Sequence, residues 1–302
     1  MNNTLTNYKT ELLKVTEKHH FTLTNEKTIP YGVSLTFALK NESICLNIYY
    51  SKKKGISTVI KSKSPLKSKL EAVLAEIYIS KKINFHNWKR WIGSDESGKG
   101  DFFGPLVVAA FYCTNSMEKG LIKIGVKDSK KLKDNQIMKI AEKVKKLYPN
   151  NIKVIILNPQ KYNEVYNKFR NQNKKLNELL AWMHSRMILD LRKKFEVDGI
   201  LIDKFTNDRV IKSSIKSMKS ENIMLQTKAE SDIAVATASI VARYHFVKKM
   251  EELEQKFDLK FSKGASNIVI SQAHNFVKKY SRDRLNEIAK LHFKTTKKID
   301  SR

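Results

Sequence analysis

The stretch that decides the fold is Gly93-Ser94-Asp95-Glu96-Ser97-Gly98-Lys99-Gly100-Asp101-Phe102-Phe103-Gly104-Pro105. It sets two adjacent carboxylates, Asp95 and Glu96, beside a glycine-rich turn. Trp91 and Ile92 before it indicate the end of a short strand, and a second apolar run follows at 106–113. We therefore expect the carboxylates at a strand-to-turn boundary. The glycines there leave backbone N–H groups uncovered, which suits close approach of a sugar or a phosphate.

Three interpretations compete for this stretch. An Asp-Glu pair in a Gly-rich turn is most often a solvated loop with a side-chain cap. The spacing from Gly93 to Lys99 also fits the G-x-x-x-x-G-K pattern of a phosphate-binding loop, but Gly100 stands where that pattern needs Ser or Thr. The two acids would also repel phosphates. The third interpretation is a metal site, in which neighbouring carboxylates bind Mg²⁺ or Mn²⁺ and further acids come from elsewhere in the chain.

Length and charge narrow the class of protein. The chain has 302 residues, 41% of them hydrophobic, enough for one large domain with an appendage or for two domains. Its formal net charge of +28, from 58 Lys and Arg against 30 Asp and Glu, favours a polyanionic partner such as nucleic acid. The alternative is a genomic bias, because the basic residues are overwhelmingly Lys, and Lys-rich surfaces also arise in Asn- and Ile-rich proteomes.

Cysteine usage and hydropathy predict the compartment. Cys45 and Cys113 lie in separate apolar runs and form no C-x-x-C pair, so we expect small buried hydrophobic residues in a reducing compartment. Residues 1–18 are polar and unlike a signal peptide, and the longest apolar run, 102–113, is too short to span a bilayer. We expect a cytoplasmic monomer with no membrane partner and no protein partner.

The N-terminal part predicts a small sheet. Residues 33–50 alternate with period two around a turn at 41–43, which indicates a β-hairpin with one apolar and one polar face. A third strand is expected at 55–60. Seven lysines and no acid occupy 51–70, which marks either a solvated linker or a contact to phosphates. Apolar residues at helical spacing predict a helix over 65–80, which we expect to bridge two domains, with the boundary at 81–87.

Lys127-Asp128-Ser129-Lys130-Lys131-Leu132 predicts a loop that enters a helix, with Asp128 or Ser129 as the N-cap. One interpretation of this segment is a plain capping motif. The exposed helix N–H groups, together with Ser129 and Lys130, could equally hold a phosphate. Further along, continuous apolar patterns predict a strand at 152–157 and a long core helix at 176–195.

Two more acids follow predicted elements. A short apolar strand at 199–203 ends in Asp203, another strand is expected at 223–226, and Glu230 and Asp232 open a helix that reaches about residue 257. Small residues early in this helix allow it to approach a sheet closely, which brings its first-turn acids near the strand ends.

Acids thus come from separated points in the chain: Asp95 and Glu96, Asp203, and Glu230 or Asp232. Three or more buried carboxylates repel one another unless divalent cations neutralise them, and two Mg²⁺ ions would do so. In a two-metal site one ion activates water and the other stabilises the leaving oxygen of an in-line phosphoryl displacement. A basic protein with this cluster is therefore predicted to be a nuclease.

The sequence resembles the ribonuclease HIII members of the ribonuclease HII/HIII family over about residues 91–295. Besides the stretch quoted at the start, the motifs that carry the resemblance are Lys-Asp-Ser-Lys-Lys-Leu from 127, Ile-Asp-Lys-Phe from 202, Lys-Ala-Glu-Ser from 228, Ala-Ser-Ile-Val-Ala-Arg from 238 and Lys-Leu-His-Phe from 290. The resemblance implies an α/β fold, an RNase H-like mixed sheet flanked by helices. It also implies a small N-terminal α+β domain similar to the TATA-binding protein. We expect this substrate-binding domain at 1–62, a helical linker at 63–87 and the catalytic domain at 88–302.

The resemblance also implies the site. The family's catalytic and metal-binding set maps onto Asp95, Glu96, Asp203 and Glu230, which would hold two Mg²⁺ or Mn²⁺ ions with Asp95 bridging them. The Gly-x-Gly turn, here Gly98-Lys99-Gly100, would contact 2′-hydroxyls through backbone groups, although Lys99 stands where Thr is expected. None of the 7 histidines lies in a motif that suggests catalysis, and we expect each in packing or at the surface.

One choice within this set rests on helical geometry. Two helical steps place Glu230 and Asp232 about 200° apart, so both cannot face one metal. Glu230 shares a face with an apolar stripe that should pack on the sheet, whereas Asp232 could lie beside the substrate. We therefore expect Glu230 to be the ligand.

The implied activity is endonucleolytic cleavage of the RNA strand of RNA/DNA hybrids, leaving 3′-hydroxyl and 5′-phosphate ends. In ribonuclease HII the region corresponding to residues 263–266 carries a tyrosine that stacks under the deoxyribose at an RNA-to-DNA junction. This sequence has none there, the nearest downstream being Tyr280, so we expect a preference for ribonucleotide tracts over single embedded ribonucleotides. The alternatives are a non-catalytic nucleic-acid-binding protein and a transposase or recombinase nuclease that cleaves duplex DNA.

Overall fold

The computed structural model describes residues 3–51, 55–61, 64–80, 85–206, 210–211 and 222–300. The chain divides into two compact units, residues 1–83 and 84–302. Each unit has a sheet and a hydrophobic core of its own.

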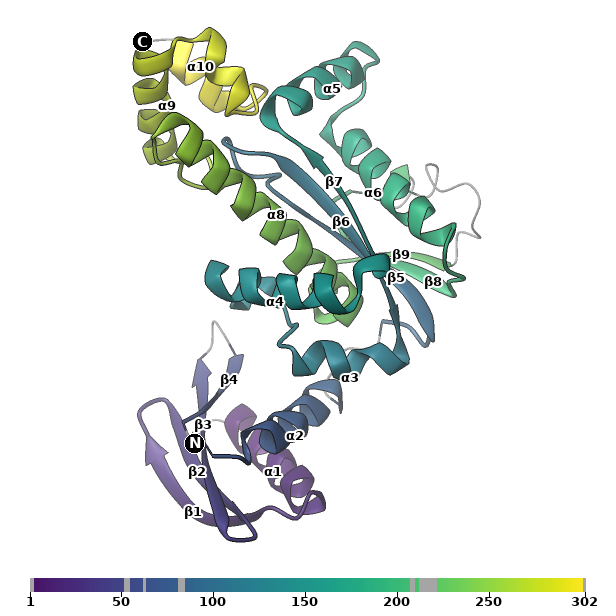
Figure 1. Ribbon diagram of the computed structural model, residues 1–302, viewed down its shortest axis with the longest axis vertical. Helices are drawn as coiled ribbons and strands as arrows, with labels where there is room; N and C mark the ends of the chain where they lie inside the picture. Colours follow the sequence, from purple (N-terminus) through teal and green to yellow (C-terminus); the bar gives the residue numbers. More distant parts are fainter. Residues whose placement is uncertain are drawn as a thin grey trace. The chain divides into compact units, whose positions relative to one another are not determined.

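The first unit is a four-stranded antiparallel sheet in the order β1-β2-β3-β4 with two helices (Figure 1). Its elements are α1 (Asn3–Lys18), β1 (Thr22–Ile29), β2 (Gly32–Leu39), β3 (Glu42–Ser51), β4 (Gly55–Ile60) and α2 (Lys67–Ser80). The hairpin expected at 33–50 is present as β2 and β3. Its apolar face buries Val33, Leu35 and Phe37 in one cluster with residues of both helices, while the opposite face is polar.

Helix α2 is an integral part of this first unit. It buries Leu70, Val73 and Ile77 in the core of the sheet and packs against α1. The helix that we expected to link two domains is thus held by the N-terminal sheet. Parts of the lysine run and of the expected boundary at 81–87 lie outside the described residues, and the predicted domain limits at 62 and 87 stay predictions.

The second unit is built on a five-stranded mixed sheet in the order β7-β6-β5-β8-β9. Its strands are β5 (Arg90–Ser97), β6 (Leu106–Thr114), β7 (Ile152–Leu157), β8 (Gly199–Asp203) and β9 (Ile223–Gln226). The central strand β5 is antiparallel to β6 and parallel to β8. This confirms the expected mixed sheet. Strand β5 is longer than its apolar start suggested, because Asp95 and Glu96 still pair with Ala109 and Val108 of β6.

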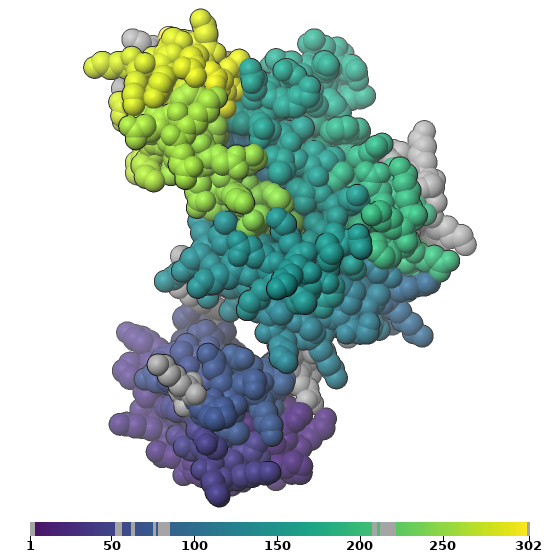
Figure 2. Space-filling model, viewed as in Figure 1, coloured from purple at the N-terminus to yellow at the C-terminus, as the bar shows by residue number. Residues whose placement is uncertain are grey.

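Helices cover both faces of this sheet, with α8 and α4 on one face and α6 on the other (Figure 1). The helices are α3 (Asn115–Lys123), α4 (Asp134–Leu147), α5 (Pro159–Asn171), α6 (Leu176–Arg192), α8 (Ile233–Phe257), α9 (Asn267–Tyr280) and α10 (Lys294–Asp300). Short 3₁₀ turns are η1 (Ser129–Lys131), η2 (Pro149–Asn151), η4 (Ala229–Ser231) and η5 (Asp283–Glu287). Figure 2 shows α9 and α10, in yellow-green to yellow, as one continuous surface, consistent with their direct packing.

Strand alternation decides which side chains meet which helix. Along β6, Val107, Ala109 and Phe111 join the cluster that contains α8, whereas Ala110 and Tyr112 join the cluster that contains α6. On β5 the α8 side is closely packed. A Cβ at Gly93 would lie 2.3 Å from the backbone nitrogen of Val235, so only glycine allows the first turn of α8 to rest on the strand. This contact brings the start of α8 beside the acids of β5.

Within the described ranges, no helix is long and apolar enough to cross a membrane. The expectations of a monomer and of a cytoplasmic location stay predictions.

Candidate active site

Asp95 and Glu96 are neighbours in sequence but lie on opposite faces of β5, because side chains alternate along a strand. Asp95 faces α8, where the hydroxyl of Ser239 hydrogen-bonds its carboxylate. Glu96 faces α6 and approaches His184. The two carboxylates therefore have different neighbours within the protein.

The Asp95 carboxylate is buried and sits among other acids. Its Oδ1 accepts a hydrogen bond of 2.8 Å from the backbone nitrogen of Glu96. Burial raises the pKa of Asp95 well above its ordinary value, and the negative charges of Glu96 and Asp203 raise it further. A carboxylate in this situation gains from a nearby cation.

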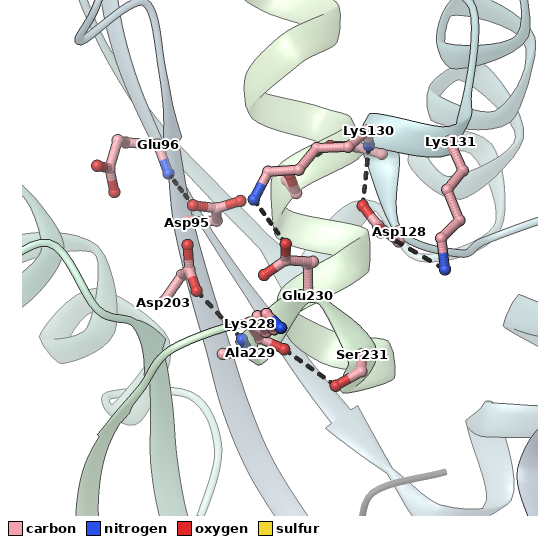
Figure 3. A network of polar contacts seen from close by, with 12 residues as sticks. Asp95, Glu96, Asp128, Lys130, Lys131, Asp203, Lys228, Ala229, Glu230 and Ser231 are labelled. Carbon is pink, nitrogen blue, oxygen red and sulfur yellow. Dashed lines mark hydrogen bonds and ion pairs between the residues drawn. The ribbon is translucent and has the colours of Figure 1, made fainter. Parts of the chain in front are cut away.

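Asp203 and Glu230 reach the same place from β8 and η4. Figure 3 shows the carboxylates of Asp95, Asp203 and Glu230 pointing toward one another, with Glu96 turned to the other side of Asp95. The backbone nitrogen of Ala229 donates to Asp203 Oδ1 at 3.1 Å, which fixes η4 against the end of β8. Burial raises the pKa of Asp203, and the charge of Glu230 adds to this effect.

The structure corrects the reasoning that separated Glu230 from Asp232. Glu230 lies in the 3₁₀ turn η4, before the α-helix begins, so the helical-wheel argument does not apply to it. Asp232 is buried as the N-cap of α8 and accepts hydrogen bonds from the backbone nitrogens of Ala234 and Val235. It also accepts a hydrogen bond of 3.1 Å from Trp91 Nε1. Asp232 is therefore structural, and its burial disfavours the possibility that it lies beside the substrate.

The segment around Ser129 brings a cation to the acids. Asp128 caps η1 by accepting from the backbone nitrogen of Lys130, as expected for one of the two proposed caps. The ammonium group of Lys130 reaches Glu230 Oε1 at 2.6 Å (Figure 3). Burial alone would raise the pKa of Glu230, but the hydrogen bond and the charge of Lys130, together with the other hydrogen bonds of this carboxylate, outweigh it and lower that pKa. The pKa of Lys130 is raised by the same hydrogen bond.

Ser129 has an internal role instead of an exposed one. Its side chain is buried, and its Oγ lies 2.8 Å from Oγ of Ser239 on α8. Arg243 donates to the Ser129 carbonyl oxygen at 2.7 Å and also binds Asp134. These contacts anchor the 127–132 segment to α8. The Ser129 hydroxyl is thus occupied within the protein, which disfavours the predicted contact of this hydroxyl with a phosphate.

The donor chemistry of this site fits divalent cations. Its atoms are carboxylate oxygens, the ligands that Mg²⁺ and Mn²⁺ prefer. Oε2 of Glu230 is buried without a hydrogen-bond partner, and Oε2 of Glu96 is buried with only His184 Nε2 facing it at 3.3 Å, so both oxygens have lone pairs to offer a cation. As the side chains stand, no three His, Cys, Asp or Glu residues of the described ranges are arranged to hold an ion, and Lys130 supplies the positive charge. Small side-chain rotations would be needed to form a coordination shell.

His184 is the residue that sequence reasoning missed. It was expected in packing or at the surface, yet its Nε2 lies 3.3 Å from Glu96 Oε2. Burial alone would raise the pKa of Glu96, but the contacts with His184 and Lys99 outweigh it and hold the pKa of Glu96 below its ordinary value. No local motif marks this histidine, because its partner lies far away in sequence and the two meet only through the packing of α6 on the sheet.

The glycine-rich turn after β5 is open on one side and tightly packed on the other. Gly98 has φ +89°, and a Cβ there would lie 2.1 Å from the carbonyl oxygen of Pro105. A Cβ at Gly100 would meet nothing within 4 Å, so this backbone is accessible. No helix follows Lys99, since residues 98–105 form turns and an isolated bridge. A phosphate-binding loop needs a helix at that point, so that interpretation is excluded.

Lys290, in the C-terminal segment, binds the backbone of this turn. Lys290 is 1% exposed, and its ammonium group donates to the carbonyl oxygens of Phe103, Gly104 and Pro105. The backbone nitrogen of Lys290 also donates to the Phe102 carbonyl oxygen at 2.8 Å. One buried side chain thus takes the place of several missing backbone hydrogen bonds and fixes the base of the turn.

Comparisons with known proteins agree with the fold. The family model described as Ribonuclease HII matches residues 92–296. The mixed sheet, the acidic central strand and this match define the class of the protein as an endoribonuclease of the RNase H type.

Individual relatives give the family. Ribonuclease HIII of Protochlamydia amoebophila is 39% identical over 205 residues, which are 68% of this chain and 66% of that protein. Ribonuclease HIII of Bacillus cereus is 41% identical over 214 residues, 68% of this chain and 67% of that protein. The crystal structure of Bst-RNase HIII in complex with Mn²⁺ has 29% identity and a TM-score of 0.65 over 96% of both chains. The chain belongs to the ribonuclease HII/HIII family, on its ribonuclease HIII side.

Proposed function

We propose that the protein cleaves the RNA strand of RNA/DNA hybrids with the help of two divalent cations. The observation that carries this proposal is the convergence of Asp95, Asp203 and Glu230, from three separate segments, in a family of ribonucleases. Buried carboxylates that raise one another's pKa are a costly arrangement unless cations bind there. The basic surface, with a formal net charge of +28, suits a polyanionic substrate.

Asp95, Glu96, Asp203 and Glu230 are the residues that would hold the cations. Asp95 lies between Glu96 and Asp203, the position expected of a ligand shared by two ions. Mn²⁺ in the related Bst-RNase HIII supports Mg²⁺ or Mn²⁺ as the cofactor. When bound, such cations supply an activated water and stabilise the leaving oxygen of the phosphodiester. Attack in line with the 3′-oxygen would leave 3′-hydroxyl and 5′-phosphate ends.

Recognition of RNA is assigned to the turn at Gly98-Lys99-Gly100. The open backbone at Gly100 allows a ribose 2′-hydroxyl to approach, which a DNA strand lacks. Lys99 lies 3.6 Å from Glu96 Oε1, so its side chain is directed to the acid, and the substrate contact of this turn is left to the backbone. Lys130 is largely exposed and is the better candidate than Ser129 for a phosphate contact.

The preferred target is a tract of ribonucleotides. The residues that follow the long helix α8, Lys263-Gly264-Ala265-Ser266, include no aromatic ring, and the space around Gly264 is open. An aromatic platform contributes about 1–3 kcal/mol per stacked base. Without one, incision at a single embedded ribonucleotide should be slower by about one or two decades than cleavage within a tract.

The test uses matched duplexes of one sequence with Mg²⁺ and, separately, Mn²⁺. The set comprises an RNA/DNA hybrid, an RNA duplex, a DNA duplex and a DNA duplex with one ribonucleotide. We expect rapid cleavage of the hybrid only, with 3′-hydroxyl products. Binding without cleavage of any duplex would indicate a non-catalytic protein, and cleavage of the DNA duplex would indicate a DNA nuclease. Equal rates on the hybrid and the single-ribonucleotide duplex would overturn the tract preference.

A further inference from the structure

His184 is held rigidly between the sheet and α6. It is 0% exposed, and its Nδ1 lies 2.7 Å from Oγ of Ser94 on β5. Oγ of Ser94 in turn lies 2.8 Å from the carbonyl oxygen of Ala109. These contacts fix the orientation of the His184 ring.

The other ring nitrogen faces an acid that is proposed to bind metal. Nε2 of His184 and Oε2 of Glu96 are 3.3 Å apart. Both atoms are buried, and neither has a hydrogen-bond partner elsewhere in the described part of the chain. Unpaired buried polar atoms are costly, so two that face each other at this distance satisfy one another through one shared proton.

Two further residues complete the surroundings of Glu96. The ring of Phe205 stacks on His184 with centroids 4.7 Å apart and an interplanar angle of 11°. Lys99 Nζ lies 5.5 Å from the centroid of the same Phe205 ring. Lys99 also approaches Glu96 Oε1 at 3.6 Å, so each carboxylate oxygen of Glu96 has one basic neighbour.

We propose that His184 is a positioning residue that fixes the orientation of the Glu96 carboxylate for cation binding. Glu96 is the only one of the four proposed ligands that faces α6, so no other acid of the set can orient it. A glutamate side chain loses several rotamers when it is fixed, and a partner that fixes it beforehand removes this cost from metal binding. This inference rests on the proposed function, because it takes Glu96 as a ligand.

The experiment measures Mn²⁺ binding to the full chain by calorimetry, without substrate, in three variants of one residue. His184→Gln places an amide nitrogen near the position of Nε2 and keeps the contact with Glu96. His184→Asn places its amide near Nδ1 and keeps only the contact with Ser94. His184→Ala removes both contacts. Partners of metal ligands typically contribute 10- to 100-fold to metal affinity. We therefore expect His184→Asn and His184→Ala to lose Mn²⁺ affinity by roughly this factor, and His184→Gln to lose less than about threefold.

The paired design separates positioning from simple damage to the core. Thermal melting without metal reports the structural cost of each variant, and Asn and Gln are both polar and shorter than the histidine ring. His274→Gln is the control, since His274 also has a buried Nε2 without a hydrogen-bond partner but lies on α9. It should leave Mn²⁺ affinity unchanged. The inference would be overturned if His184→Gln and His184→Asn lost Mn²⁺ affinity equally. It would also be overturned if His184→Asn and His184→Ala bound Mn²⁺ as tightly as the wild type.

A second set of variants, made on Glu96→Gln, distinguishes failure of this inference from failure of the proposed function. Glu96→Gln should weaken Mn²⁺ binding, and adding His184→Ala to it should cause no further loss, because the contact to be oriented is gone. If Glu96→Gln bound Mn²⁺ like the wild type, the proposed ligand set itself would be wrong. If Glu96→Gln weakened binding while His184→Ala did not, only the positioning role would fail.

Discussion

The ammonium nitrogen of Lys130 lies 2.6 Å from Oε1 of Glu230, in the group of acids where cations are proposed to bind. Lys130 therefore neutralises Glu230 when no metal is present and competes with a metal for the same oxygen. A partly exposed ion pair of this kind contributes up to about 1 kcal/mol. Lys130→Met should tighten Mn²⁺ binding by about two- to fivefold, measured by calorimetry, and should weaken binding of a hybrid.

Lys131→Met is the matched control, because Lys131 is an exposed neighbour that pairs with Asp128 at 3.7 Å and not with Glu230. It should change Mn²⁺ affinity little. Unaltered Mn²⁺ affinity in Lys130→Met would mean that the lysine leaves Glu230 before the metal arrives.

Lys290 gives a prediction about alkaline stability. Burial lowers the pKa of Lys290 to about 7, an effect that the charge of Asp101 offsets only in part. An unfolded chain keeps an ordinary lysine pKa of about 10.4 and thus binds one more proton than the folded chain between these values. The free energy of unfolding contributed by this group therefore rises as pH rises from 7 to 10. The melting temperature of the wild type relative to Lys290→Met should increase over this range.

Lys294→Met, at an exposed position, is the control and should show no such trend. At each pH, Lys290→Met should also raise KM for the hybrid more than it changes kcat, because Lys290 fixes the base of the turn at 98–105, which is proposed to contact the substrate. A constant difference in melting temperature from pH 7 to 10 would show that Lys290 stays protonated in its ring of carbonyl oxygens.

Charge repulsion among the acids predicts that removing one of them raises the stability of the protein and lowers its activity. Asp95→Asn keeps the shape of the side chain and removes a buried charge whose pKa is raised by burial and by neighbouring acids. In EDTA this variant should be more stable than the wild type by about 1–3 kcal/mol, measured by denaturant unfolding. Cleavage of a hybrid with Mg²⁺ should fall by orders of magnitude while binding persists.

Asp203→Asn should behave in the same way, with a smaller gain in stability because Asp203 is less buried. The control is Asp190→Asn on the outer side of α6, where the carboxylate pairs with Lys193. It should retain full cleavage. Near wild-type cleavage by Asp95→Asn or Asp203→Asn would remove that residue from the site.

The N-terminal unit is expected to add affinity and not chemistry. Deletion of residues 1–62, the domain expected from the sequence, would expose the apolar side of α2, which packs on the N-terminal sheet. Deletion of 1–83 follows the observed division of the chain. The truncated protein should bind a hybrid more weakly and with a shallower salt dependence, since each phosphate contact contributes about 0.9 to the slope. An unchanged slope would assign all phosphate contacts to residues 84–302.

The sequence predicted those features that depend on local pattern. The hairpin at 33–50, the strand that ends in Asp203 and the long helix after Glu230 follow from period-two alternation, apolar runs and helical spacing. The gathering of Asp95, Asp203 and Glu230 followed from placing each acid at the end or start of an element of one sheet layer. These predictions needed only the direction of each element.

The features that were missed depend on which faces of two distant elements meet. That Glu96 faces away from Asp95 follows from β5 continuing through the acids, which the expected turn at Gly93 obscured. The contact of His184 with Glu96 and the N-cap role of Asp232 each join residues that no spacing rule connects. No local pattern distinguishes the buried Lys290 from the other lysines of this lysine-rich chain.

The four acids are distributed over β5, β8 and η4, so the site comes into being only when these segments have paired in the finished sheet. A chain still being synthesised carries Asp95 and Glu96 long before Glu230 exists, so it lacks the complete set of proposed ligands. On this proposal the protein gains nuclease activity only when folding is complete. If these acids bind Mn²⁺ as proposed, retention of the ion measures how much of the protein population is native.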